Sequence, residues 1–284
     1  MTDQLAYFDA RIRPPFKEFL KLPRYDTSLK QGLVSYETPP RSVAERSMEA
    51  LFEEMDEVNI SRGLVMGRHT VTNAWIPNES VAEFRREYKD RFWVFGGVGE
   101  NKPSENLEEA KRCIEELGLD GIALDPGWLN PPRKADDRYF YPVYAYCETE
   151  GISVSVSMSI NSGPDLSFSD PVAIQRITMD FPKLRLVVSH AGWPMITAML
   201  AVAAKHPNVW LLPDLYMNSV GLPGRGELIE AANHPILKKK IIFGSAYPSK
   251  GIEESVNAVL ELPLSEESQS LVFHGNLLDF LKEG

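Results

Sequence analysis

The sequence predicts an α/β protein, a single-domain (β/α)8 TIM barrel that extends over residues 1–284. Short apolar runs alternate with longer amphipathic stretches eight times, which is the order of elements that gives a parallel sheet. A chain of 284 residues with 43% apolar side chains suits one barrel of this kind. A doubly wound open sheet is the alternative, but residues 9–15 read DARIRPP and form no glycine-rich phosphate loop.

Eight short runs have the apolar, aromatic and β-branched composition of buried strands. The third run, residues 92–98, has the strongest strand composition, because it reads FWVFGGV. We expect strands at residues 6–12, 63–66, 92–98, 121–124, 152–158, 184–188, 209–212 and 241–243. At least one helical stretch follows each run, so the eight strands are expected to run parallel.

The stretches between these strands show helical spacing of apolar residues and recognisable ends. Ser42 and Glu45 have the spacing of a capping box, and Gly118 and Gly151 stand where glycine ends a helix. We expect helices at residues 42–58, 79–90, 104–117, 139–150, 171–181, 195–205, 227–233, 252–262 and 266–281.

A long proline-rich loop at about residues 14–41 follows the first strand and shows no clear period. It begins at the mouth of the predicted barrel, where long loops serve as lids or interfaces. Its basic residues Lys17, Lys21, Arg24 and Lys30 suit an anionic ligand. A dimer contact or a plain surface cover is the alternative.

Composition and charge exclude several classes of function. Acidic residues number 40 and basic residues 30, so the net charge is −10, which argues against binding to nucleic acid or to an anionic membrane. Cys113 and Cys147 form no motif together, and residues 1–10 have no secretory-signal pattern. We therefore expect a cytoplasmic protein without a disulfide framework, and homo-oligomerisation stays open.

The first strand is the most informative segment, because functional groups of a barrel lie at the carboxyl ends of its strands. Asp9, Arg11 and Arg13 alternate with Ala10 and Ile12, so we expect the polar set to face the lumen and the apolar pair to face helices. Two buried guanidinium groups beside one carboxylate leave a surplus of positive charge. A small anionic ligand is therefore predicted, and a structural ion pair with Asp9 is the alternative.

Other polar side chains follow the predicted strands. His69 and His190 are the histidines at this end, and His190 is the candidate general base or acid. Asp125 is a candidate to orient a base or to act as one, or else it forms the turn before Pro126. The candidate substrate-binding residues are Asp9, His69, Ser157, Asp214, Tyr216, Tyr247, Trp193 and Trp128.

Four motifs at strand ends resemble one family. They are Phe8-Asp9-Ala10-Arg11-Ile12-Arg13, Gly151-Ile152-Ser153-Val154-Ser155-Val156-Ser157, Ser189-His190-Ala191-Gly192-Trp193-Pro194 and Phe243-Gly244-Ser245-Ala246-Tyr247-Pro248. Together they resemble the amidohydrolase-related branch of the amidohydrolase superfamily, the branch of aminocarboxymuconate-semialdehyde decarboxylases and pyrone-dicarboxylate lactonases. The resemblance covers nearly the whole chain and implies a barrel enzyme with its site at the strand ends.

The resemblance also implies a metal site whose ligands this sequence replaces. In the family the metal is held by two histidines of the first strand, one of the fifth strand and an aspartate of the eighth. Those positions carry Arg11, Arg13, Ser157 and Ala246, and the histidine of the sixth strand, His190, is kept. Arginine stays protonated and cannot ligate zinc. We therefore expect no catalytic metal and no other cofactor.

These observations predict a metal-independent, amidohydrolase-like hydrolase for a small carboxylate-bearing substrate. Arg11 and Arg13 would clamp a carboxylate or an oxyanion, while His190 and Asp125 would handle protons. Hydrolysis of a lactone, an ester or a carbon–carbon bond fits this set. Two alternatives stay open, a catalytically silent relative that binds an anionic metabolite or acts in assembly, and a decarboxylase or other lyase of the same family.

Overall fold

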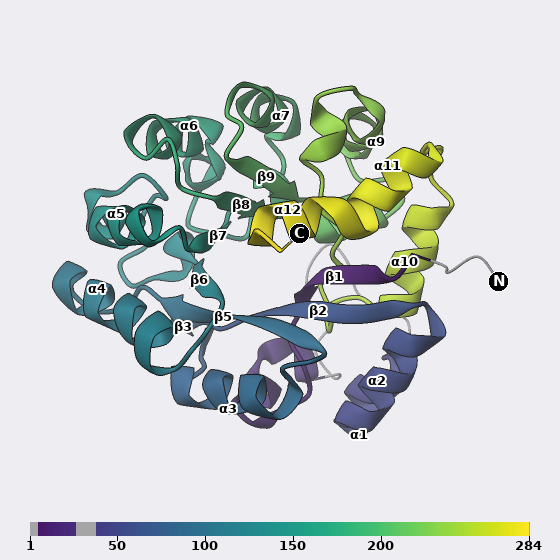
Figure 1. Ribbon diagram of the computed structural model, residues 1–284, viewed down its shortest axis with the longest axis horizontal. Helices are drawn as coiled ribbons and strands as arrows, with labels where there is room; N and C mark the ends of the chain where they lie inside the picture. The colour runs from purple at the N-terminus through teal and green to yellow at the C-terminus, as the bar shows by residue number, and fades with distance from the viewer. Residues whose placement is uncertain (1–4, 27–37, 284) are drawn as a thin grey trace.

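The computed structural model describes residues 5–26 and 38–283. Its main sheet is wholly parallel, and the strands follow one another in the order in which they occur along the chain (Figure 1). The strands are β1 (Tyr7–Ile12), β2 (Ile60–Met66), β5 (Phe92–Val98), β6 (Gly121–Leu124), β7 (Ser153–Ser157), β8 (Leu186–Ser189) and β9 (Val209–Leu212). This order confirms the predicted α/β barrel class, because each crossover helix returns the chain to the next parallel position.

The eighth position of the barrel is filled without a regular strand. At residues 241–247 the chain forms single parallel bridges, from Ile241 to Leu211 of β9 and from Tyr247 to Ile12 of β1. Backbone bonds also join Ile242 N to Leu211 O at 2.9 Å and Ala10 N to Phe243 O at 3.0 Å. The prediction of a regular strand at 241–243 is therefore wrong. The segment nevertheless links β9 to β1.

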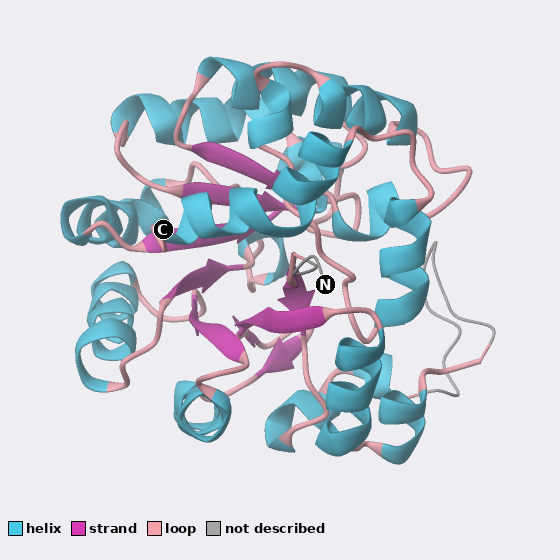
Figure 2. Ribbon diagram, turned by 45° about the vertical axis from the view of Figure 1, so that its right-hand side comes forward, coloured by secondary structure: helices cyan, strands magenta, loops and turns pink. Residues whose placement is uncertain are grey.

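Helices surround the sheet, and a late helix crosses the centre of one end (Figures 1 and 2). They are α1 (Arg41–Glu45), α2 (Met48–Glu57), α3 (Asn78–Tyr88), α4 (Pro103–Lys111), α5 (Tyr141–Glu150), α6 (Pro171–Asp180), α7 (Ile196–Lys205), α8 (Asp214–Asn218), α9 (Arg225–Asn233), α10 (Ile252–Leu260), α11 (Glu266–Ser270) and α12 (Asn276–Leu281). Among the described residues, no helix has both the length and the apolar character that a membrane crossing requires.

The helix expected at 42–58 is divided in two. Arg46 adopts a left-handed conformation with φ of 53° and ends α1, and the Ser47 side chain then accepts from Ala50 N at the start of α2. The predicted capping box is wrong, because the Ser42 hydroxyl donates to Glu54 at 2.6 Å instead of capping its own helix. A short hairpin, β3 (His69–Thr70) with β4 (Ala74–Trp75), was also not predicted.

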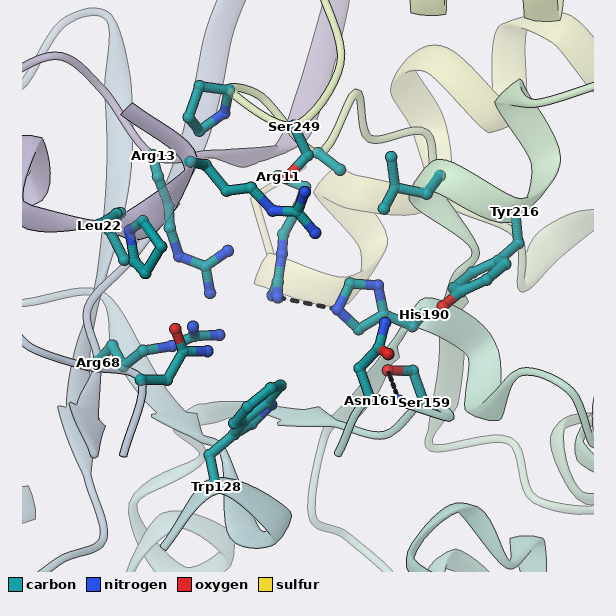
Figure 3. A pocket seen from close by; sticks show the side chains of 16 residues that line it. Arg11, Arg13, Leu22, Arg68, Trp128, Ser159, Asn161, His190, Tyr216 and Ser249 are labelled. Carbon is teal, nitrogen blue, oxygen red and sulfur yellow. Dashed lines mark hydrogen bonds between the residues drawn. The ribbon is translucent and has the colours of Figure 1, made fainter. Parts of the chain in front are cut away.

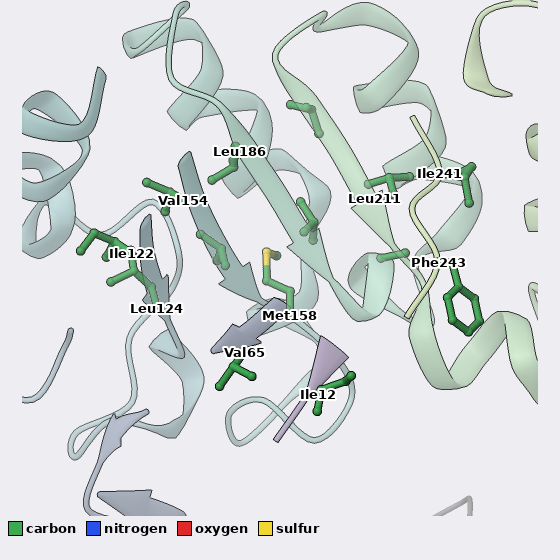
Figure 4. Close-up of a cluster of buried hydrophobic side chains, with 14 of the residues drawn as sticks. Ile12, Val65, Ile122, Leu124, Val154, Met158, Leu186, Leu211, Ile241 and Phe243 are labelled. Atoms are coloured by element: carbon green, nitrogen blue, oxygen red, sulfur yellow. The ribbon is translucent and has the colours of Figure 1, made fainter. Parts of the chain in front are cut away.

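Two apolar clusters hold the barrel together. The outward faces of the strands pack against the helices, with side chains such as Val65, Val154 and Leu211 fully buried (Figure 4). The inward faces form a second cluster that includes Trp93 and Phe95, closed by Leu277 and Phe280 of α12. Burial of large side chains such as these contributes roughly 1.5–3 kcal/mol each, so both faces of the sheet stabilise the fold.

A β-bulge in β1 decides which of its side chains enter the lumen. Asp9 pairs with Gly63 of β2, but Ile12 pairs with Val65, so β1 uses one more residue than its neighbour over this stretch. The expected simple alternation is therefore wrong for Ala10, which belongs to the inner cluster. It is also wrong for Asp9, whose carboxylate accepts from the backbone of Arg11 and not from an arginine side chain.

The loop expected at about 14–41 is described at both of its ends. It begins with two 3-10 turns, Lys17–Lys21 and Pro23–Tyr25, and α1 starts at Arg41. Lys17 forms an ion pair with Glu83 of α3. Lys30 and the middle of the predicted lid lie outside the described residues.

Candidate active site

A pocket opens where the strands of the barrel end, and its lining comes from segments far apart in the sequence. The cavity has a volume of about 320 Å³. Its polar lining includes Arg11 of β1, Arg68 after β2 and His190 after β8, and Trp128 after β6 adds an aromatic wall. Arg13 and Arg68 lie on one side and His190 and Tyr216 on the other, with Arg11 between them (Figure 3). The position agrees with the rule that barrel sites lie at the carboxyl ends of the strands.

His190 is held against a buried carboxylate. Its Nδ1 lies 2.8 Å from Oδ1 of Asp214, and Asp214 is 1% exposed. The same oxygen accepts from the Leu215 backbone at 2.9 Å, which fixes the carboxylate. Both residues have left-handed backbones, with φ of 66° at His190 and 26° at Asp214, and strain of this kind is typical of functional sites.

Arg11 approaches the imidazole of His190 at its other ring nitrogen, Nε2. Its Nη2 lies 3.3 Å from His190 Nε2, and its Nη1 donates to Ser189 Oγ at 2.9 Å. A guanidinium has only donors, so Nε2 must be the acceptor and the ring proton must be on Nδ1, where it bonds to Asp214. His190 therefore presents an unprotonated nitrogen to the pocket.

The surroundings keep His190 neutral. Burial lowers the pKa of His190, the charge of Asp214 opposes this, and the positive charges of Arg11 and Arg13 lower it further. A neutral imidazole whose Nδ1–H bonds to a carboxylate is the arrangement that a general base needs.

Asp125 is engaged by an arginine that the sequence analysis missed. Arg68 Nε and Nη2 donate to the two oxygens of Asp125 at 3.1 and 3.0 Å. Burial alone would raise the pKa of Asp125, but the charges of Arg68, Arg13 and Arg11 outweigh it and lower this pKa to about 2. Asp125 is thus charged at neutral pH beside Arg68, and it makes no hydrogen bond or ion pair with His190. Arg68 comes two residues after the end of β2. His69 was selected because it follows this strand, and the same criterion would have selected Arg68.

Arg13 lines the pocket without a counter-ion of its own. Among the described residues its side chain makes no ion pair, and its Nε is buried without a hydrogen-bond partner. Burial lowers the pKa of Arg13 well below its ordinary value, and the nearby charges of Arg68 and Arg11 lower it further. This guanidinium therefore gains most from an anion that enters the pocket.

The remaining candidates divide into two groups. Trp128 and Tyr216 line the pocket, and the Tyr216 ring stacks on Trp193 with centroids 4.7 Å apart. The others are not among the residues that line the pocket, and these are Asp9, His69, Ser157, Trp193 and Tyr247. Ser159 and Asn161, which the sequence analysis did not select, line the pocket in the loop after β7.

Two of these outlying residues have clear structural partners. His69 stacks on Trp75 of the β3–β4 hairpin with ring centroids 4.1 Å apart, and burial lowers its pKa to about 4. The Tyr247 hydroxyl lies 2.8 Å from Ser42 Oγ, away from the pocket lining.

The donor set at the pocket does not fit a family metal. The positions that would hold it carry two guanidinium groups, the hydroxyl of Ser157 and the methyl group of Ala246, and guanidinium cannot ligate. Over residues 5–26 and 38–283, no three His, Cys, Asp or Glu side chains come together in a group that could hold a metal ion.

Comparison with known families agrees with this fold. The family model described as Amidohydrolase matches residues 36–281, so the chain belongs to the amidohydrolase family. A solved structure described as an uncharacterized TIM-barrel protein from Bordetella bronchiseptica is 33% identical, with a TM-score of 0.89 over 98% of this chain and 99% of that one. The resemblance inferred from the four motifs is thereby confirmed.

Two curated relatives are enzymes. The chain is 26% identical over 211 residues to a 2-keto-4-carboxy-3-hexenedioate hydratase of Sphingobium sp., an alignment that covers 60% of this chain and 59% of that protein. It is 30% identical over 79 residues to a 2-amino-3-carboxymuconate-6-semialdehyde decarboxylase of Dictyostelium discoideum, over 28% of this chain and 21% of that protein. The match thus spans less than two thirds of the length of either relative.

Proposed function

We propose that this protein is a metal-independent hydrolase that cleaves a lactone or ester in a small carboxylate-bearing substrate. One observation carries the proposal: the unprotonated Nε2 of His190 lies in the pocket, with Asp214 behind the ring and Arg11 3.3 Å from the same nitrogen. This arrangement supplies a base, a group that orients it and a positive charge for an oxyanion.

In the proposed reaction His190 moves one proton in each direction. The carbonyl oxygen of the substrate accepts the Arg11 N–H that otherwise donates to His190 Nε2. Nε2 is then free to accept a proton from water. The water oxygen bonds to the carbonyl carbon, and the carbonyl electron pair moves to oxygen, where Arg11 stabilises the negative charge. The carbon–oxygen bond to the leaving group then breaks, and His190 Nε2–H returns its proton to the departing oxygen. Asp214 stabilises the imidazolium between the two transfers.

The test is turnover of carboxylated lactones and esters by purified protein, followed through acid release. We expect His190→Asn to lower the rate by about 10²–10⁴-fold, because general-base catalysis contributes that much. His234→Asn is the matched control, since His234 is exposed and does not line the pocket. A His190→Asn protein that keeps the wild-type rate would rule out this mechanism.

Hydration of a carbon–carbon double bond is the second candidate. It is favoured by the 26% identity over 211 residues to a hydratase, and it needs the same base and the same polarised carbonyl. The two reactions differ in product, because hydration consumes a conjugated double bond and releases no acid. Loss of ultraviolet absorbance without acid release would select hydration, and release of carbon dioxide would select a decarboxylase instead.

A further inference from the structure

We propose that the pocket separates recognition from reaction, so that Arg13 and Arg68 bind the carboxylate of the substrate while Arg11 and His190 act on a carbonyl elsewhere in the same molecule. The substrate class that follows is a carboxylate on a flat, apolar or unsaturated frame, which Trp128 contacts. This inference rests on the proposed function, since it assigns the reacting carbonyl to His190.

The hydrogen bonds of the three arginines set them apart. Arg11 is committed to the reacting side, where it contacts Ser189, His190 and Met66 and lies 3.7 Å from Asp214. Arg68 uses Nε and Nη2 on Asp125, which leaves Nη1 for a ligand.

Arg13 has no such commitment. No hydrogen bond or ion pair of its side chain occurs in the described part of the chain, although it lines the pocket and its Nε is buried.

The balance of arginines and carboxylates at the pocket indicates that an anionic ligand would bind beside Arg13. Within residues 5–26 and 38–283, two carboxylates form ion pairs with the polar residues of the pocket. Asp125 is bonded to Arg68, and Asp214 is bonded to His190 and lies near Arg11. A carboxylate seated between Arg13 and Arg68 would give Arg13 the counter-ion that it lacks. Guanidinium forks match carboxylate oxygens in geometry as well as in charge.

The arrangement of side chains in the pocket separates the proposed carboxylate-binding residues from the proposed base. Arg13 and Arg68 lie together on the side opposite His190, and the ring of Trp128 extends along the pocket below them (Figure 3). A ligand that reaches from Arg13 to His190 therefore passes the indole of Trp128. Aromatic walls favour flat apolar groups, which defines the frame of the substrate.

The test uses benzoate as a probe and benzamide as its neutral counterpart, with binding measured by calorimetry. We expect the wild-type protein to bind benzoate about 10–100-fold more tightly, because hydrogen bonds to charged groups contribute that difference. Arg13→Met should abolish the preference. This variant should also fold at least as well as the wild type, because it removes a guanidinium group that has no counter-ion in the part of the chain that the structure describes. Arg86→Met, which changes an exposed arginine of α3, is the matched control.

A second variant tests the other half of the subsite. Arg68→Met together with Asp125→Leu removes the whole ion pair, so neither partner is left as an uncompensated buried charge. It should lose the preference for benzoate as well, and if it fails to fold, Arg13→Met alone decides. An Arg13→Met protein that still prefers benzoate as strongly as the wild type overturns the proposal. Inorganic phosphate that binds as tightly as benzoate overturns the assigned ligand class.

The same titration in His190→Asn separates this inference from the proposed function. Benzoate binding without turnover in that variant agrees with both. Turnover that survives the substitution removes the proposed mechanism and leaves the binding subsite standing. A missing preference for benzoate in a protein whose turnover depends on His190 removes the subsite alone.

Discussion

The two ends of the barrel lumen are built from the same strands and differ in almost every physical respect. The end closed by α12 is apolar, with Phe8, Trp93 and Phe280 in one buried cluster. The other end holds Arg11, Arg13, Arg68 and their few carboxylate partners around a cavity. In β1 the change from one environment to the other takes place between Ala10 and Arg11, at the bulge. A short stretch of strand can therefore serve both packing and chemistry.

One end of the lumen contributes to stability through apolar burial, and the other end contains strained backbone. The apolar end gains free energy from burial alone. The polar end buries charge, and four of its non-glycine residues have positive φ, namely His190, Ala191, Asp214 and Ala246. Such conformations cost on the order of 1–3 kcal/mol each and persist only where the surroundings enforce them.

The largest effect should come from breaking the apolar end. Phe280→Ala removes a fully buried ring from the inner cluster and should lower the free energy of unfolding by about 3–5 kcal/mol. Met179→Ala is the control, because Met179 of α6 is 65% exposed and should change stability by about 0.5 kcal/mol or less. Chemical denaturation measures both. Equal stability of the two variants would contradict the assignment of α12 as a structural closure.

At the polar end, Asp214→Asn should lower both turnover and stability. The amide can donate to His190 Nδ1 and so favour the tautomer whose Nε2 is protonated, which cannot accept a proton from water. We expect a loss of about 10²–10⁴-fold in turnover. The melting temperature should fall as well, because the buried guanidinium of Arg11 loses the carboxylate that lies 3.7 Å away. Asp90→Asn, the same change at an exposed position, should leave the rate unaltered. A variant that kept full activity would show that Asp214 does not position the base.

The smallest expected effect is a displaced pH profile. The base must be unprotonated, so the rate should rise with pH through the pKa of His190, and burial lowers this pKa below its ordinary value of 6.5. The rate should therefore reach half of its maximum at a pH below 6.5 and should be constant at neutral pH. Arg11→Met removes a neighbouring positive charge and should move the midpoint to higher pH. A midpoint at or above 7 in the wild-type protein would contradict the buried-base geometry.

Much of the fold followed from periodicity, because seven of the predicted strands occur as strands. Among them β5 and β7 are buried on both faces. The eighth failed because residues 241–247 are held by single bridges and side-chain bonds, which apolar composition does not reveal. Strand alternation also failed at Asp9 and Ala10, since a bulge depends on the register with β2 and not on local sequence.

The candidate site was predictable in its location but not in its pairings. His190, Arg11 and Arg13 line one pocket as expected, because strand ends converge at one face of a barrel. That Asp214 contacts His190 while Asp125 contacts Arg68 could not be predicted, since both aspartates follow strands and only their spatial neighbours distinguish them.

Closure of the barrel also constrains how the chain matures during translation. β1 bonds to residues 241–247, and α12 then fills the lumen that β1 helps to form. The first strand therefore lacks part of its native surroundings until residues near 280 are available, and Phe8 and Ala10 stay without these neighbours until then. Contacts between such distant segments slow folding and leave apolar surface exposed in the meantime. Closure of this barrel is therefore a late step, and the first strand keeps apolar surface exposed until α12 packs into the lumen.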